Sequence, residues 1–185
     1  MINTKNIPNI ITVIRILLVP VTVWLLIAQQ FKLAFAVFLF AGASDAVDGF
    51  LARRVNARTE LGTYLDPLAD KALLVSVYGT LGIIKILPAW LVLIVVTRDI
   101  MIIGGVMLAW LMEKPFAMKP LFISKANTAA QIILAGFVLG ILSTDTRLDL
   151  ILNLGMIAVA LLTIASGAFY LRDWAAHMNR TGENP

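Results

Sequence analysis

The stretch DLILNLGMIAVALLTIASGAFYLR, residues 149–172, contains no charged residue between Asp149 and Arg172. A helix that crosses a bilayer needs about 20 consecutive, mostly apolar residues, so this stretch indicates a membrane-spanning helix. The rest of the chain has the same character, because 60% of its 185 residues are hydrophobic and only 14% are charged. Soluble domains have about 25% charged residues. A water-soluble fold is therefore excluded, and so is a disordered chain, which requires low hydrophobicity.

Five further apolar stretches precede this one. With it, their approximate bounds are 8–28, 31–52, 65–87, 89–112, 123–143 and 149–172. The breaks between them are short, and the chain contains no internal repeat or linker long enough to separate domains. We therefore predict an all-α integral membrane protein, in which residues 1–185 form a single domain built as a bundle of six transmembrane helices.

Lysine and arginine residues are unevenly distributed between the two sides of this predicted bundle. One side comprises the two tails and the breaks that follow the second and fourth stretches, with the residues that border them. It carries Lys5, Arg53, Arg54, Arg58, Lys114, Lys119, Lys125, Arg172 and Arg180. The other side comprises the breaks that follow the first, third and fifth stretches, and it carries Lys32, Lys85 and Arg147. Because basic residues are in excess on the cytoplasmic side of membrane proteins, nine against three predicts that both termini are cytoplasmic. We expect a location in the cytoplasmic membrane of a bacterium. No basic run with interleaved aromatic residues supports a nucleic-acid partner.

Four aspartates lie in or near two consecutive apolar stretches, where such residues are rare because an intramembrane carboxylate costs about 2.5–3.5 kcal/mol. Asp45 and Asp48 are three residues apart, and Asp66 and Asp70 are four apart. Each pair therefore lies on one face of a helix. At 100° per residue, the same two faces also carry the small residues Gly49, Ala52 and Gly62. The two stretches are joined by a short turn, so we expect the carboxylate pairs to face each other near the cytoplasmic surface.

Four neighbouring carboxylates repel one another unless cations lie between them. Hard divalent cations with oxygen ligands are the natural partners, and Mg²⁺ usually keeps coordination positions open for substrate phosphates. Two such ions can hold both sides of an in-line phosphoryl displacement. The aspartates therefore predict a site for two divalent metal ions and a diphosphate. The chain has no cysteine, which excludes a thiolate metal site.

A structural role for these aspartates is the alternative. They would then form salt bridges at the ends of the loop, with the basic residues Arg53, Arg54, Arg58 and Lys71. Pro67 leaves two further possibilities open, since a proline either kinks a helix or occupies its first turn. In the latter case, Asp66 would cap a helix that begins there.

The motif reads Asp45-x2-Asp48-Gly49-x2-Ala52-Arg53-x8-Gly62-x3-Asp66-x3-Asp70. It resembles, position for position, the signature of the CDP-alcohol phosphotransferase family, and the similarity covers most of the chain. The resemblance implies a six-span homodimer that uses Mg²⁺ or Mn²⁺. In this family an alcohol attacks the lipid-side phosphorus of a CDP-linked donor, and CMP departs. By resemblance, the metal ligands are Asp45, Asp48, Asp66 and Asp70, with Asp70 also the catalytic base. The CDP-binding residues are Asp48, Gly49, Ala52, Arg53 and Gly62.

Three further segments bear on the identity of the alcohol. The opening Asn6-Ile7-Pro8-Asn9, followed by Thr12 and Arg15, resembles that of the phosphatidylglycerol and cardiolipin branches, although an ordinary helix start would look the same. Arg98-Asp99 stands where bacterial phosphatidylglycerophosphate synthases usually have Arg-Glu, but the second arginine of those enzymes is replaced by Val106. A buried Arg98–Asp99 structural ion pair is the alternative there.

The segment Lys119-Pro120-x3-Ser124-Lys125-x-Asn127-Thr128-x2-Gln131 is similar to that of the mitochondrial-type cardiolipin synthases. A simpler interpretation, in which Ser124 caps a helix and Lys125 extends to the membrane surface, explains only two of these residues. The residues expected to bind the acceptor and its phosphate are Arg15, Arg98, Lys119 and Lys125.

These features favour transfer of a phosphatidyl group from CDP-diacylglycerol to phosphatidylglycerol, which yields cardiolipin. Glycerol 3-phosphate is the alternative acceptor. An intramembrane prenyltransferase and a cation transporter are remote alternatives, because the first class has more spans and the second is expected to show inverted repeats.

Overall fold

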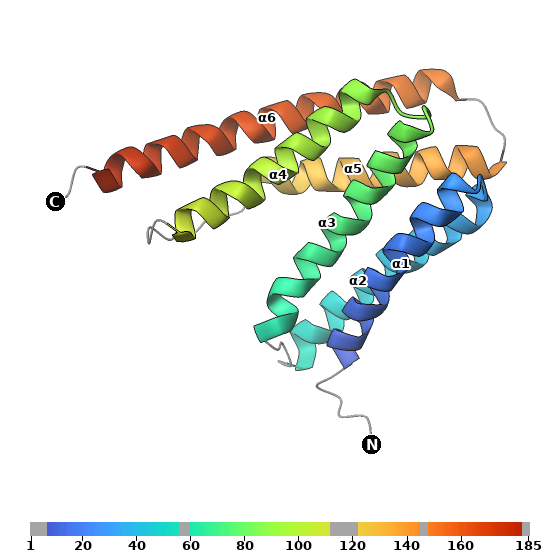
Figure 1. The fold of residues 1–185 in the computed structure, drawn as a ribbon, viewed down its shortest axis with the longest axis horizontal. Helices are drawn as coiled ribbons and strands as arrows, with labels where there is room; N and C mark the ends of the chain where they lie inside the picture. The colour runs from blue at the N-terminus through green and yellow to red at the C-terminus, as the bar shows by residue number, and fades with distance from the viewer. Residues whose placement is uncertain (1–6, 56–59, 112–121, 145–147, 183–185) are drawn as a thin grey trace. The chain divides into compact units, whose positions relative to one another are not determined.

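The computed structural model describes residues 7–55, 60–111, 122–144 and 148–182, with side chains for 13–44, 71–104, 122–144 and 148–175. Over these ranges the chain forms six α-helices and no strand (Figure 1). The helices are α1 (Ile7–Ile27), α2 (Phe31–Val55), α3 (Glu60–Ile83), α4 (Ala89–Leu111), α5 (Phe122–Thr144) and α6 (Asp149–Gly182). They match the six predicted apolar stretches one to one, which confirms the all-α fold.

Four helix ends differ from the predicted bounds by three residues or more. Helix α2 ends at Val55 rather than at residue 52, and α3 ends at Ile83 rather than at residue 87. Helix α3 begins at Glu60 rather than at residue 65, and α6 continues beyond residue 172 to Gly182. Because α3 is already helical before Asp66, this residue does not cap the start of a helix.

Two of the described helices are long and apolar enough to cross a membrane, namely α5 and the part of α6 from Asp149 to Ala175. The large apolar side chains Leu150, Leu154 and Leu161 of α6 are 73%, 59% and 65% exposed. An exposed apolar face of this extent is suited to lipid rather than to water. These features indicate a membrane protein, whereas the six-span arrangement and the cytoplasmic position of both termini stay predictions.

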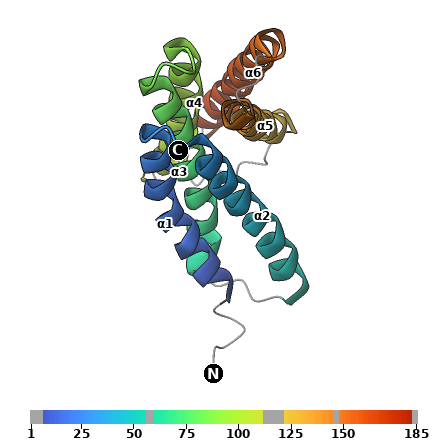
Figure 2. The same ribbon diagram turned by 90° about the vertical axis from the view of Figure 1, so that its right-hand side faces the viewer.

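Residue contacts divide the chain into two compact units, so the single-domain organisation stays a prediction. The first unit comprises Met1–Leu87 and Ala135–Leu148. In it, α1 packs against both α2 and α3 (Figure 2). The buried core of this unit includes Leu26, Val77, Tyr78, Leu81 and Leu139. Among the described residues, α2 and α3 have no close backbone approach, and the expectation that their aspartate-bearing segments face each other stays a prediction.

The turn after α1 is closed by backbone hydrogen bonds. The amide of Gln30 donates to the carbonyl of Leu25 at 2.9 Å, and the amide of Gln29 donates to the carbonyl of Leu26 at 3.1 Å. This pair of bonds is the Schellman arrangement, which requires a left-handed residue just after the helix. Gln29 has this conformation, with φ 57°. The turn ends α1 at the break that the sequence predicted, and α3 ends in the same way before Lys85.

The second unit comprises Pro88–Leu134 and Asp149–Pro185, and in it α4 packs against α6. Gly167 lies in this contact, because a Cβ atom there would lie 3.4 Å from the Cε of Met101. The hydroxyl of Tyr170 donates to the carbonyl oxygen of Ile102 at 3.3 Å. Gly167 and Tyr170 are three residues apart and so lie on the same face of α6.

Candidate active site

The predicted metal and CDP-binding residues lie on α2 and α3. These residues are Asp45, Asp48, Gly49, Ala52, Arg53, Gly62, Asp66 and Asp70. The backbone of each is helical, but their side chains lie outside the described residues. Among the side chains that the structure describes, no group of three or more His, Cys, Asp or Glu residues could hold a metal ion. The backbone is therefore the basis for locating the site.

The helix bounds place the two carboxylate pairs at matching depths. Asp45 precedes the end of α2 at Val55 by ten residues, and Asp70 follows the start of α3 at Glu60 by ten residues. At a rise of 1.5 Å per residue, each lies about 15 Å along its helix from the α2–α3 connection. Residues 56–59 form this connection, so Val55 and Glu60 are within about 18 Å of each other. Both pairs thus belong to the same end of the first unit.

The chemistry of these residues fits a hard divalent cation. Each helix contributes two carboxylates, and α2 and α3 are continuous through the motif, so the spacings of three and four residues keep each pair on one face. Carboxylate oxygens are the ligands that Mg²⁺ and Mn²⁺ prefer. The donor set therefore suits the two metal ions that the sequence predicted.

Arg15 brings a positive charge to α2 beside this motif. Its side chain is only 1% exposed. With Phe40, Ala41 and Ser44 of α2, it lines a small cavity of about 70 Å³. Ser44 directly precedes Asp45 in the sequence, so Arg15 lies on α1 at the depth of the first aspartate pair. A buried cation at this place favours an anionic group nearby.

Arg98 of α4 is the centre of a buried polar cluster in the second unit. Its Nη1 donates to the carboxylate of Asp99 at 2.6 Å, and its Nη2 donates to the hydroxyls of Ser124 and Ser166, each at 2.6 Å. Arg98 and Asp99 are only 4% and 1% exposed. The structure therefore contains the ion pair that the sequence left as an alternative, and it joins α4, α5 and α6 through one guanidinium.

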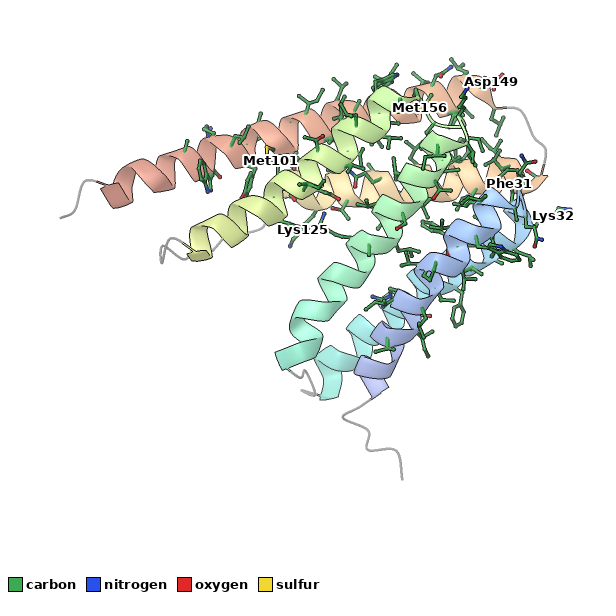
Figure 3. All side chains as sticks on the ribbon, in the orientation of Figure 1. Phe31, Lys32, Met101, Lys125, Asp149 and Met156 are labelled. Carbon is green, nitrogen blue, oxygen red and sulfur yellow. The ribbon has the colours of Figure 1, made fainter. Side chains whose placement is uncertain are left out.

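One face of α5 continues this cluster. The hydroxyl of Thr163 donates to the Oδ1 of Asn127 at 2.9 Å, and the Nε2 of Gln131 donates to the hydroxyl of Thr163 at 3.5 Å. All three residues are buried. Ser124 lies three residues before Asn127, on the same face. The segment that resembled cardiolipin synthases thus contributes interhelical contacts, while its exposed Lys125 projects from α5 (Figure 3).

Sequence reasoning missed Thr163 and Ser166 of α6. Both are buried, and each hydrogen-bonds to another helix. Two hydroxyl residues three apart in an apolar span were the available signal, because polar side chains in such spans usually bond across helices. Lys119, also predicted to bind the acceptor, lies outside the described residues.

Residues 5–172 match the model of the CDP-alcohol phosphatidyltransferase family. Over 148 residues the chain is 40% identical to human cardiolipin synthase (CMP-forming), an alignment that covers 71% of this chain and 49% of the human protein. It is 36% identical over 146 residues to the chloroplastic CDP-diacylglycerol–glycerol-3-phosphate 3-phosphatidyltransferase 1 of Oryza sativa subsp. japonica, covering 70% of this chain and 44% of the relative. A putative cardiolipin synthase of Mycobacterium tuberculosis is 36% identical over 106 residues, covering 57% of this chain and 51% of the relative.

The chain spans about half the length of the curated relatives it matches. The relatives come from animals and plants as well as from bacteria. This chain is 40% identical to the human relative and 36% identical to the mycobacterial relative. The higher identity to the human protein counts against the location in a bacterial membrane that we expected from the sequence.

Proposed function

Because the chain belongs to the CDP-alcohol phosphatidyltransferase family, we propose that it transfers a phosphatidyl group from CDP-diacylglycerol to an alcohol and releases CMP. The observation that carries this proposal is the family match over residues 5–172, which includes the complete aspartate motif. The matching depths of the two aspartate pairs on α2 and α3 support it.

Phosphatidylglycerol is the acceptor we favour, with cardiolipin as the product. The human relative at 40% identity is named a cardiolipin synthase. Val106 stands where an additional arginine would help to neutralise the dianionic phosphate of glycerol 3-phosphate. Desolvated phosphates are usually bound by several charged donors, and a phosphodiester with one charge needs fewer of them.

Glycerol 3-phosphate is the second candidate acceptor. The rice relative at 36% identity is named for this activity, and its identity differs little from that of the human protein. Both reactions use the same donor and release the same nucleotide. Enzymes that prefer one acceptor or the other are therefore expected to differ in the residues that surround the acceptor.

The chemical step is a displacement at the lipid-side phosphorus. The acceptor hydroxyl oxygen forms a new bond to this phosphorus, and the bond from the phosphorus to the oxygen of CMP breaks. We assign Asp70 as the general base that takes the hydroxyl proton. Two Mg²⁺ or Mn²⁺ ions, held by Asp45, Asp48, Asp66 and Asp70, would neutralise the charge of the diphosphate.

The CDP portion of the donor is assigned to the small and basic residues of the same motif. Gly49 allows close approach of a ligand to the α2 backbone. Arg53 offers a bidentate guanidinium to a phosphate. Asp48, Ala52 and Gly62 complete this set by resemblance to the family.

Cations from three helices or their connections are assigned to the acceptor phosphate. Arg15 is proposed because it lies on α1 at the depth of the first aspartate pair, and Lys119 and Lys125 because they belong to the segment at the start of α5. Arg98, the fourth residue that the sequence assigned to the acceptor, has protein partners on both terminal nitrogens. We therefore assign it an indirect role, through its contact with Ser124, the residue before Lys125.

The proposed membrane arrangement has six spans, with both termini and the active site at the cytoplasmic face. It is supported by the six helices and by the excess of basic residues on one side of the predicted bundle. One domain over residues 1–185 and a homodimer are proposed from the family resemblance.

The acceptor assignment is tested by giving purified protein radiolabelled CDP-diacylglycerol and Mg²⁺ in mixed micelles, with either phosphatidylglycerol or glycerol 3-phosphate. We expect labelled cardiolipin and little turnover of glycerol 3-phosphate. Labelled phosphatidylglycerophosphate without cardiolipin would establish the second candidate instead. Transfer to neither acceptor would contradict both.

A further inference from the structure

The first turn of α5 is attached to α4 through the side chain of Arg98. Ser124 is the third residue of α5, which begins at Phe122, and its hydroxyl accepts a hydrogen bond of 2.6 Å from Arg98. Helix ends are the parts of a helix most prone to fraying. A charge-assisted hydrogen bond at this position therefore has a large influence on how the helix starts.

The guanidinium that makes this bond is itself held firmly. Asp99 accepts from its Nη1, and Ser166 of α6 accepts from the same Nη2 that reaches Ser124. Gly167 also packs against Arg98, since a Cβ atom there would lie 3.8 Å from the Cγ of Arg98. Arg98 is thus fixed from α4 and α6 before it contacts α5.

These contacts oppose a direct role for Arg98 in binding an anion. Both terminal nitrogens are in use, and the carboxylate of Asp99 neutralises the charge at 2.6 Å. The side chain is also only 4% exposed. An acceptor phosphate would have to enter a buried position and compete with the carboxylate of Asp99 for the guanidinium, which would weaken a buried ion pair.

The bond to Ser124 holds the first turn of α5 in the same rotation as the polar residues that follow it. Asn127 and Gln131 lie on the same face as Ser124 and hydrogen-bond to Thr163 of α6. Lys125 follows Ser124 by one residue, which turns it by about 100° away from this face. Lys125 is exposed, so its direction depends on where the polar face of α5 is held.

We propose that Arg98 is a positioning residue, which holds the first turn of α5 through Ser124 and thereby sets the place where Lys125 meets the phosphate of the acceptor. This inference rests on the proposed transferase function, in which Lys125 binds the acceptor. In this account the Arg98–Asp99 ion pair affects the affinity for the acceptor and takes no part in the chemical step at the aspartates.

The test compares Ser124→Ala with Ser166→Ala, because the two hydroxyls accept from the same nitrogen but belong to different helices. For Ser124→Ala we expect the KM for phosphatidylglycerol to rise by about threefold to tenfold, the range set by one interhelical hydrogen bond in a membrane. The kcat and the KM for CDP-diacylglycerol should stay within about twofold. Ser166→Ala should raise the KM for phosphatidylglycerol less than Ser124→Ala does, because Asp99 still holds Arg98 and Ser124 still accepts from it. Ser124→Thr, which keeps a hydroxyl, should retain the parental KM.

Direct contact of Arg98 with the acceptor predicts the opposite result. Ser124→Ala would then free a guanidinium proton for the phosphate and leave the KM for phosphatidylglycerol unchanged or lower it. Equal increases in Ser124→Ala and Ser166→Ala would also overturn the proposal, because the effect would then not be transmitted through α5.

A second measurement does not depend on transfer activity. The chain has no cysteine, so Lys125→Cys provides a single site for a nitroxide spin label. We expect Ser124→Ala to increase the mobility of this label more than Ser166→Ala does. An unchanged label in Ser124→Ala would refute the positioning role even in a protein without detectable transfer. Absence of transfer with the expected label mobility would instead refute only the proposed function.

Discussion

Removing the carboxylate of Asp99 should destabilise the protein more than removing the whole ion pair. The guanidinium of Arg98 lies 2.6 Å from this carboxylate, and the two side chains are 4% and 2% exposed. In Asp99→Leu the buried charge keeps only two serine hydroxyls as acceptors. Leaving a buried charge without its partner costs about 3–5 kcal/mol. The double variant Arg98→Met/Asp99→Leu has no buried charge and loses the two serine bonds, at about 0.6 kcal/mol each in a membrane.

The assay is the free energy of unfolding, titrated with sodium dodecyl sulfate in mixed micelles and followed by tryptophan fluorescence. Arg172 and Asp173 are the matched control, because they are the same two residue types in the same order, 3.3 Å apart but 73% and 38% exposed. An exposed pair contributes about 0–1 kcal/mol, so Asp173→Leu should have little effect. A loss of less than about 1 kcal/mol in Asp99→Leu, or a double variant less stable than Asp99→Leu, would refute the buried ion pair.

Four other predictions concern the motif, a helix contact and a turn. Asp70→Asn should abolish transfer, while the affinity for CDP-diacylglycerol stays within about tenfold because three carboxylates still hold metal. Asp48→Asn should instead raise the Mg²⁺ concentration that transfer requires. An unchanged Mg²⁺ titration in this variant would contradict the role of Asp48 as a ligand. Gly167→Leu should lower the free energy of unfolding by about 1–3 kcal/mol through overpacking against α4, whereas Gly42→Leu should not, because a Cβ atom at Gly42 would have no neighbour within 4 Å. Lys85→Gly should raise the free energy of unfolding by about 0.5–1 kcal/mol, because Lys85 has φ 62°, a left-handed conformation that glycine adopts without strain; an unchanged or lower value would contradict this reasoning.

The sequence predicted the number and order of the helices, because apolar runs and their polar breaks determine where the chain can cross a bilayer. It placed the start of α3 at residue 65 instead of Glu60 and the end of α6 at 172 instead of Gly182. These two errors have one cause, whereas α3 ends at Ile83 rather than at residue 87 because a hydrogen-bonded turn closes the helix there. Hydropathy detects the part of a helix that lies in lipid, and a helix with polar residues continues beyond this part without any hydropathy signal.

The role of Arg98 could not be decided from the sequence. Its hydrogen-bond partners Ser124 and Ser166 are 26 and 68 residues away along the chain. Their hydroxyls become acceptors for Arg98 only when α4, α5 and α6 adopt particular rotations about their axes. Those rotations depend on interhelical packing, such as the contact of Gly167 with α4, which local sequence patterns do not specify.

The most direct test of the central claim is the stoichiometry of the reaction. Purified protein is incubated with CDP-diacylglycerol, phosphatidylglycerol and Mg²⁺, and the CMP and cardiolipin formed are both quantified, with and without chelator. A phosphatidyl transfer predicts equal amounts of CMP and cardiolipin, with neither formed after the metal is removed. Cardiolipin without CMP, or transfer that persists in excess chelator, would contradict the proposed metal-dependent reaction.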